Sequence, residues 1–242
     1  MAEKLIQKLR ILHGNIHEWN KRLKKQISER ARIFRNRYER RKLKSTEFSI
    51  ISNTCIGGVI CHDMGLRFLS PTVNIYIRPV EFVRFCENLH YYLEQPFVEE
   101  PYNDDIGYPV AKLGDITLYC KHFTNFEDAK SAWERRCKRI EWDHIYLMMT
   151  DRDFIPPVSI TKKIDACDET TIERFDALPF RNKVCIVKDS KYTEKYKSCR
   201  QLTKGCDKNC VGIITNKIGI TGKRMYQYVK DFDYIKFINN GF

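Results

Sequence analysis

Apolar residues recur at every third or fourth position along the first part of the chain. This spacing predicts one apolar stripe on a long amphipathic helix, with Gly14 as its weakest point. The polar faces of the same helix are rich in Lys and Arg. The predicted stripe consists of Leu5, Leu9, Leu12, Ile16, Trp19, Leu23, Ile27, Ala31, Phe34 and Tyr38.

After Ser45 the pattern changes to short apolar runs separated by helical stretches, which begin at Pro79, after Asn125 and near Glu169. Strands that alternate with helices predict an α/β fold: a mostly parallel sheet with helices on both faces, in a Rossmann-like three-layer arrangement. We therefore expect a basic amphipathic helical arm, residues 1–46, and an α/β domain, residues 47–242. The expected strands are 48–52, 73–77, 116–120, 145–149, 184–187 and 211–215.

The net charge of +12 is concentrated in the arm. Residues 1–46 carry 15 Lys and Arg against 4 Asp and Glu, whereas the remainder carries 28 against 27. A basic amphipathic helix suits an anionic membrane surface, where each Lys or Arg contributes about 1 kcal/mol. We expect residues 1–44 to bind such a surface, the alternative being packing on the body or on a partner helix. No nucleic acid is expected, because the body lacks a second basic patch.

The distribution of apolar residues also bears on the cellular compartment. The N-terminus has no apolar run typical of a signal peptide, and no segment approaches 18 consecutive apolar residues. We expect a cytoplasmic protein that the arm attaches peripherally to the inner membrane. The ten cysteines are then expected to remain reduced.

The turn after the first expected strand reads Asn53-Thr54-Cys55-Ile56-Gly57-Gly58. Sites of α/β sheets lie at the carboxyl ends of strands. Adjacent glycines let the backbone approach a ligand, and a helix N-terminus offers free N–H groups to an anion. Asn53, Gly57 and Gly58 are therefore predicted to bind substrate. The turn matches no nucleotide fingerprint, and a tight structural bend is the alternative.

Cys55 in this turn is a candidate nucleophile. A cysteine at a helix N-terminus is expected to have a lowered thiol pKa, and a nearby histidine would serve as its base, the arrangement used in acyl transfer. The candidate bases are His62 and His122. We predict Cys55 and His122 as catalytic residues and His62 as a substrate-binding residue, the alternative being a buried structural cysteine.

The apolar run 145–149 leads into Asp151-Arg152-Asp153. Two carboxylates two residues apart on an extended strand point the same way and can share a divalent cation, as in many glycosyltransferases that bind a sugar-nucleotide diphosphate. Asp151 and Asp153 are thus candidate ligands of a divalent metal that accompanies a sugar nucleotide. We predict a metal-free site instead, with Asp151 catalytic and Arg152 and Asp153 binding substrate. The metal pair and a structural turn are the alternatives.

Arg135 and Arg136 lie on the helix predicted after Asn125. An arginine on this helix could reach an acidic substrate, so both are predicted substrate-binding residues. The alternative is a solvated basic face.

Six sequence blocks, in this order, resemble the bacterial family catalogued as domain of unknown function nineteen-nineteen. The resemblance covers residues 47–242 and excludes the arm. Members are commonly labelled exopolysaccharide biosynthesis proteins, so the resemblance implies a role in surface-glycan assembly on lipid-linked intermediates. The blocks are FSIISNTCIGGVICHDMGLRFLSPTVNIYI, YPVAKLGDITLYCKHF, FEDAKSAWERRCKRI, TDRD, FDALPFRNKV and DFDYIKFINNG.

The family pattern falls on all the candidate site residues except His62. After Asp153, where members tend to have Gly-Cys, this chain has Phe154-Ile155-Pro156-Pro157. We expect a glycosyl- or acyltransferase of exopolysaccharide, capsule or lipopolysaccharide biosynthesis, acting on a glycan or lipid-linked glycan intermediate. The alternative is a non-enzymatic accessory or glycan-binding protein of the same pathway.

Overall fold

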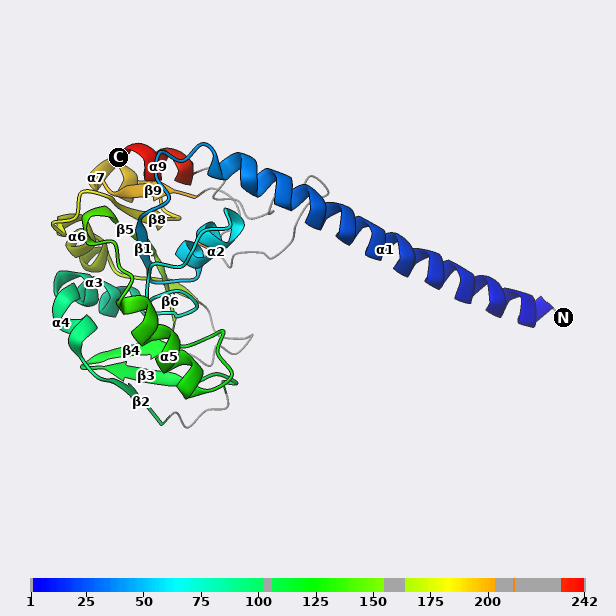
Figure 1. Cartoon of the computed structure of the whole chain (residues 1–242), viewed down its shortest axis with the longest axis horizontal. Coiled ribbons are helices and arrows are strands. Elements are labelled where there is room, and N and C mark those ends of the chain that lie inside the picture. Colours follow the sequence, from blue (N-terminus) through cyan, green and yellow to red (C-terminus); the bar gives the residue numbers. More distant parts are fainter. Residues whose placement is uncertain (1, 102–105, 155–163, 203–210, 212–231, 242) are drawn as a thin grey trace.

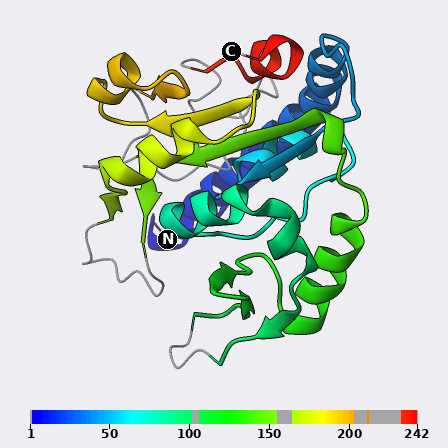
Figure 2. The ribbon, with the colours of Figure 1, turned by 90° about the vertical axis from the view of Figure 1, so that its left-hand side faces the viewer.

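The computed structural model describes residues 2–101, 106–154, 164–202, 211 and 232–241. Its central sheet has four parallel strands in the order β1-β5-β8-β9, which lie side by side in Figure 2. This confirms an α/β fold with a parallel sheet. The strands are β1 (Ser49–Ser52), β5 (Ile145–Thr150), β8 (Lys183–Val187) and β9 (Cys199–Gln201).

Alternate residues of these strands face two different hydrophobic clusters. Ile50 and Met148 belong to one cluster, with α2 (Ile56–Asp63) and α9 (Tyr234–Asn240). Ile51 and Leu147 belong to the other, with helices that cover the opposite face. Those helices are α3 (Pro79–Glu87), α4 (Leu89–Glu94), α5 (Phe126–Cys137), α6 (Glu169–Ala177) and α7 (Lys191–Lys195).

Sequence signals at the helix starts are confirmed. Pro79 occupies the first position of α3, where its missing N–H costs nothing. The Asn125 side chain accepts a hydrogen bond from the Asp128 backbone N–H and caps α5. Asp168 caps α6 in the same way.

The expectation that residues 116–120 join the parallel sheet is wrong. They contribute β4 (Ile116–Tyr119) to a separate antiparallel sheet with β2 (Phe97–Glu99) and β3 (Val110–Leu113). The turn between β3 and β4 contains Gly114 at φ +62°, a conformation that allows so short a connection.

The expected strand 73–77 is also wrong. Asn74 takes a positive φ, and the described residues pair with this segment through an isolated bridge from Tyr76 to Tyr119. Of the expected strand 211–215, all but Val211 lies outside the described residues. The described residues also form β6 (Arg152–Asp153), which pairs with β7 (Asp165–Ala166), and a 3-10 turn, η1 (Trp142–His144).

Helix α1 (Ala2–Arg40) extends away from the body, and only its C-terminal end lies beside α2 and α9 (Figure 1). There Arg32 lies 3.5 Å from the Asp63 carboxylate, and Asn239 hydrogen bonds to the backbone of Lys42 and Lys44. Among the helices of the described residues, none is long and apolar enough to cross a bilayer.

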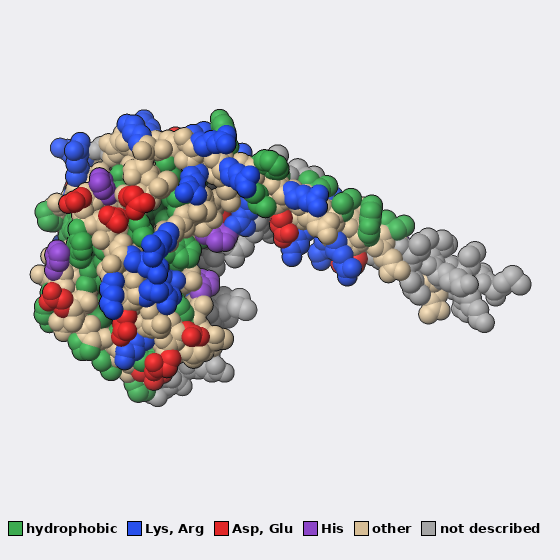
Figure 3. Space-filling view, in the orientation of Figure 1, with side chains coloured by type: hydrophobic (Ala, Val, Ile, Leu, Met, Phe, Trp, Pro, Cys, Tyr) green, Lys and Arg blue, Asp and Glu red, His purple; other side chains and the backbone are tan. Residues whose placement is uncertain are grey.

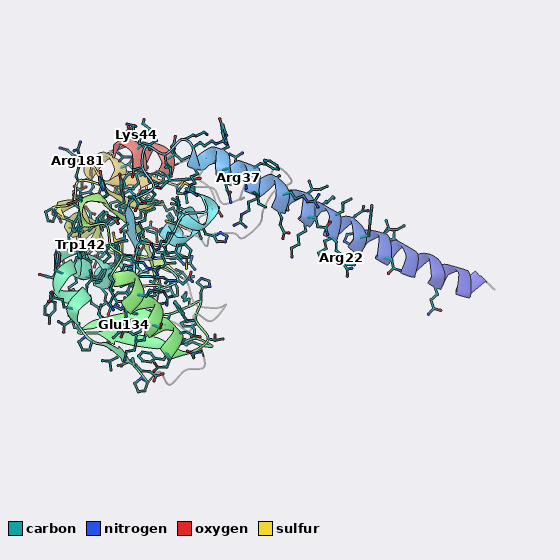
Figure 4. The ribbon with its side chains drawn as sticks, viewed as in Figure 1. Arg22, Arg37, Lys44, Glu134, Trp142 and Arg181 are labelled. Carbon is teal, nitrogen blue, oxygen red and sulfur yellow. The ribbon has the colours of Figure 1, made fainter. Side chains whose placement is uncertain are left out.

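From Ile16 onward, where the side chains of α1 are described, the large residues of its apolar stripe are not covered by the body. Trp19 is 62% exposed and Phe34 72%. Basic side chains such as Arg22 and Arg37 project from the same helix (Figure 4). Of the predicted stripe, the exposed large residues are Ile16, Trp19, Leu23, Ile27, Phe34 and Tyr38. Their exposure leaves the helix with an apolar face that a membrane or another molecule can cover.

Candidate functional site

Cys55 and His122 meet at the carboxyl edge of the sheet. Cys55 follows β1 and directly precedes α2, whereas His122 follows β4. The Cys55 Sγ atom lies 3.2 Å from Nε2 of His122, within hydrogen-bonding distance for a thiol and an imidazole. Cys55 is half-buried and His122 is exposed, so a ligand can approach the pair from solvent.

The pKa of the Cys55 thiol differs from the expectation. Burial raises it, and this effect exceeds the opposing influence of the positive charge on Lys121. The predicted lowering by the helix N-terminus is therefore wrong for the resting protein. A neutral thiol needs a base to become a nucleophile, and the His122 ring nitrogen is the group in reach.

Lys121 is a site residue that the sequence analysis missed. Its ammonium group is largely buried, which lowers its pKa to about 8, while Cys55 raises that pKa and Arg152 lowers it. The nitrogen lies 4.0 Å from the ring centroid of Phe154 and 5.1 Å from that of Tyr76. In the sequence, the position of Lys121 next to His122 is the one hint that it belongs to the site. Its contacts with Tyr76 and Phe154 cannot be predicted, because these rings come from distant segments.

Arg152 lies in the same region. Its side chain is buried, with the guanidinium carbon 5.3 Å from the Phe154 ring centroid, and it donates to the carbonyl of Val211 at 3.5 Å. Phe154 thus contacts two cations, and it stacks on Tyr76 with centroids 4.3 Å apart. The structure therefore brings the predicted residues Cys55, His122 and Arg152 into one neighbourhood with Lys121.

Asn53 is fully buried and joins two strands. Its amide donates to the carbonyl of Thr150 at 3.2 Å and accepts from the Thr150 N–H at 2.9 Å, so it continues the pairing of β1 with β5. No solvent-facing atom is left to contact a substrate. The structure assigns Asn53 a role in holding the site's two strands together.

Gly57 and Gly58 lie within α2 and are buried. A Cβ on Gly57 would approach Ile50 Cγ2 to 2.8 Å, and a Cβ on Gly58 would approach Val73 Cγ1 to 2.9 Å. Real Cβ atoms are not found so close to their neighbours. Close packing of α2 on β1 and on Val73 is thus sufficient reason for both glycines, without a ligand.

Asp151 is buried and bonded to backbone. Its carboxylate accepts hydrogen bonds from the N–H groups of Val211 at 2.8 Å and Lys188 at 2.9 Å. Burial raises the pKa of its carboxyl to about 6, against the lowering effect of these bonds. Asp151 therefore fastens the end of β5 to Lys188, which follows β8, and to Val211.

Asp153 forms a bidentate pair with Arg78, with both N–O distances 2.9 Å. Both candidate metal ligands thus already have partners, and the partners are different. Within the described ranges, no group of three or more His, Cys, Asp and Glu side chains is placed to hold a metal ion. Arg78 was not predicted, because nothing in the sequence links it to Asp153.

The remaining predicted residues lie elsewhere. Arg136 is buried and donates to the carbonyl of Val73 at 2.8 Å, and Arg135 is exposed beside it. His62 lies at the far end of α2, where its ring contacts Arg32 of α1 at 2.7 Å. His62 is therefore part of the junction between α1 and the body.

A second surface feature is a pocket of about 420 Å³ beside the exposed Trp142. The Trp142 ring stacks on His90, with centroids 4.0 Å apart and planes at 9°. Glu94, Gln95 and Glu134 supply polar groups around the pocket. An exposed aromatic face with carboxylates and amides nearby suits a ring that has one apolar face and several hydroxyl groups.

The fold and the Cys55–His122 pair define an α/β protein with a thiol–imidazole pair at the carboxyl edge of a parallel sheet. The family described as "Domain of unknown function (DUF1919)" matches residues 26–239, and the chain belongs to it. The family resemblance is therefore confirmed, but the expectation that it excludes the arm is wrong, because the match includes the C-terminal part of α1. An "Uncharacterized protein" of Haemophilus influenzae is 36% identical over 222 residues, covering 90% of this chain and 97% of that protein.

Proposed function

We propose that the protein is an acyltransferase of surface-glycan assembly, with Cys55 as the nucleophile and His122 as its base. The observation that carries this proposal is the 3.2 Å contact between the Cys55 thiol and the imidazole of His122. Sites of Rossmann-like three-layer folds lie at this edge of the sheet, and we assign the fold to that class because both sheet faces are covered.

The reaction begins with an acyl thioester donor, such as an acyl-coenzyme A. His122 accepts the thiol proton of Cys55, and the sulfur attacks the donor carbonyl. The carbonyl's bond to the donor sulfur breaks, and that sulfur takes the proton from His122. The result is an acyl thioester on Cys55 and a free donor thiol.

The second step passes the acyl group to a hydroxyl of a glycan or lipid-linked glycan. His122 accepts the hydroxyl proton while the oxygen attacks the Cys55 thioester. The ester forms, the C–S bond breaks, and Cys55 recovers its proton from His122. Lys121 is the nearby cation that would stabilise negative charge on the sulfur or the carbonyl oxygen, since its charge already lowers the pKa of Cys55.

The proposed role in surface-glycan assembly rests on the exopolysaccharide biosynthesis label that members of the family commonly carry. The proposed attachment to a membrane rests on α1. The exposed stripe of α1 and its Lys and Arg residues suit the surface of an anionic bilayer. A cytoplasmic enzyme attached in this way would meet lipid-linked intermediates at the inner membrane.

The test is the release of coenzyme A from a panel of acyl-coenzyme A donors, followed by chromatography. The wild type is expected to release it, with water as a slow acceptor, and His122→Ala to do so about 10²–10⁴-fold more slowly. Cys55→Ser should abolish release. Cys137→Ser is the matched control, because Cys137 is also a half-buried free thiol but lies on α5. Equal release by the wild type and Cys55→Ser would contradict the proposal.

A second candidate function is glycan binding without catalysis, favoured by the pocket at Trp142 and His90. It predicts that oligosaccharides quench tryptophan fluorescence, and that Trp142→Ala removes the effect while Cys55→Ser retains it. Glycan binding with no thiol-dependent release of coenzyme A would favour this candidate over the acyltransferase.

A further inference from the structure

A polar groove of about 440 Å³ lies at the amino edge of the sheet. Thr46 and Glu47 of its lining precede β1, and Glu141 precedes β5. Parallel strands begin at one edge of a sheet and end at the other, so this groove lies opposite the edge that carries Cys55 and His122. It cannot be part of the same site.

Four cations from three separate segments line the groove. Arg40 comes from the end of α1, Arg67 from the segment after α2, and Lys138 and Arg139 from the end of α5. Figure 3 shows Lys and Arg side chains gathered on the body, over the end of α5 and the loops beside it, so the expectation that the body lacks a second basic patch is wrong. Glu47 and Glu141 are the acidic members of the lining, so its formal charge is positive.

The charge of the groove is not neutralised within the described part of the chain. There, Arg67, Lys138 and Arg139 have neither an ion pair nor a side-chain hydrogen bond, and Arg40 makes only a 3.5 Å bond to the carbonyl of Gly65. Desolvation, followed by the charges of Arg67 and Arg135, lowers the pKa of Arg139. Four cations face only two carboxylates in this lining, so the excess positive charge is self-repelling, and a bound anion would relieve this repulsion.

Helix dipoles account for three of the four cations taken one at a time. Lys138 and Arg139 follow the C-terminal end of α5, and Arg40 lies in the last turn of α1, where cations interact favourably with the helix dipole. Arg67 lies on neither helix, and the dipoles do not explain why the two helix ends and Arg67 line one groove. Guanidinium groups that converge from separate segments suit the bidentate binding of phosphate oxygens.

We propose that this groove binds a phosphoryl group of a phosphorylated ligand. Its volume falls in the range of small-molecule sites, about 300–1,000 Å³. The phosphoryl group belongs either to a soluble phosphoester or to a lipid headgroup, and Arg40 places part of the groove on the helix with the exposed apolar stripe. The proposal is independent of the chemistry at Cys55.

The experiment uses the full chain with Arg67→Gln, Arg139→Gln and the double variant. Arg181→Gln is the matched control: Arg181 is exposed on the body, lies outside the groove lining and loses the same charge (Figure 4). Calorimetry measures the binding of inorganic pyrophosphate. Flotation measures binding to phosphatidylcholine vesicles with and without phosphatidic acid. Thermal melting confirms that each variant is folded.

Each groove substitution is expected to weaken binding on the order of tenfold, while Arg181→Gln binds as the wild type does. Loss of pyrophosphate binding assigns a soluble phosphoester, and loss confined to phosphatidic acid vesicles assigns a lipid headgroup. The proposal is overturned if the wild type binds neither probe, or if Arg181→Gln weakens binding as much as the groove variants. It is also overturned if Arg139→Gln lowers the melting temperature and leaves binding unchanged. The interaction of Arg139 with the dipole of α5 would then be enough to explain its position.

Discussion

The ammonium nitrogen of Lys121 lies 4.0 Å from the ring centroid of Phe154, in a largely buried position near Cys55. Burial disfavours the charged form and lowers the pKa of Lys121 to about 8. The aromatic ring compensates in part, because a cation over a ring face is attracted to it. The fold therefore holds a cation beside the thiol at a cost in stability.

Lys121→Met is expected to melt at a higher temperature than the wild type near pH 7. The pKa of Lys121 is about 8 in the folded chain against an ordinary value of 10.5, so charging this lysine costs folding free energy at every pH below 8. That cost disappears as pH rises from 8 to 10.5. Melting curves across this range should show the advantage of the variant fading with rising pH, and a variant less stable than the wild type near pH 7 would refute the argument.

Gly58→Ala is expected to destabilise the protein by about 1–3 kcal/mol, although alanine is the better helix former. The reason is the approach of the new Cβ to Val73 Cγ1 at 2.9 Å. Urea unfolding measures the change. The double variant Gly58→Ala with Val73→Ala removes the opposing methyl groups and should cost less than the sum of the single changes. Additive losses would show that Val73 is not the obstacle.

Asp151→Asn is expected to lower the free energy of unfolding by about 1–3 kcal/mol at pH 5, where the raised pKa of about 6 leaves the folded Asp151 carboxyl mostly protonated and both side chains are neutral. An amide can accept only one of the two hydrogen bonds that the carboxyl oxygens take from Val211 and Lys188, and its NH₂ group would face a backbone N–H. Asp189→Asn is the control, because Asp189 is exposed and an amide there can still accept the hydrogen bond from the Lys191 N–H. Equal stability of Asp151→Asn and the wild type would restore Asp151 as a candidate for chemistry rather than structure.

The double variant Trp19→Ser with Phe34→Ser is expected to lose binding to vesicles that contain anionic lipid. Both residues are exposed on α1, so their removal should leave the fold intact. Sedimentation with vesicles measures the binding, which should also fall as salt screens the basic residues. Tyr91→Ser with Val98→Ser is the control, since these apolar residues are exposed on the body. Unchanged sedimentation of the α1 variant would argue for another partner of the stripe.

The sequence predicts β1, β5 and β8 well because each is a short apolar run between clear turn signals. Residues 73–77 are a short apolar run as well, and an apolar run alone does not distinguish a strand from an irregular buried segment. In the structure Asn74 adopts a left-handed backbone conformation, which interrupts this run. Spacing alone also cannot show what a carboxylate binds. Asp151 and Asp153 fit a metal pair by spacing, and their partners, backbone N–H groups and Arg78, become visible only in three dimensions.

Residue type and strand-end position predicted Cys55 and His122 as candidates for one site. The contact between them depends on β4 belonging to the separate antiparallel sheet, which places His122 beside the end of β1. The raised pKa of Cys55 could not be predicted, because it depends on burial by segments distant in the chain.

Trapping of the covalent intermediate tests the central claim most directly. The full chain is mixed with acyl-coenzyme A donors, quenched in acid at successive times and analysed by intact mass and peptide mapping. We predict one acyl group on Cys55, formed about 10²–10⁴-fold more slowly in His122→Ala, and absent in Cys55→Ser. Acylation of other cysteines at the same rate as Cys55, or no adduct with any donor, would contradict the assignment of Cys55 as the nucleophile.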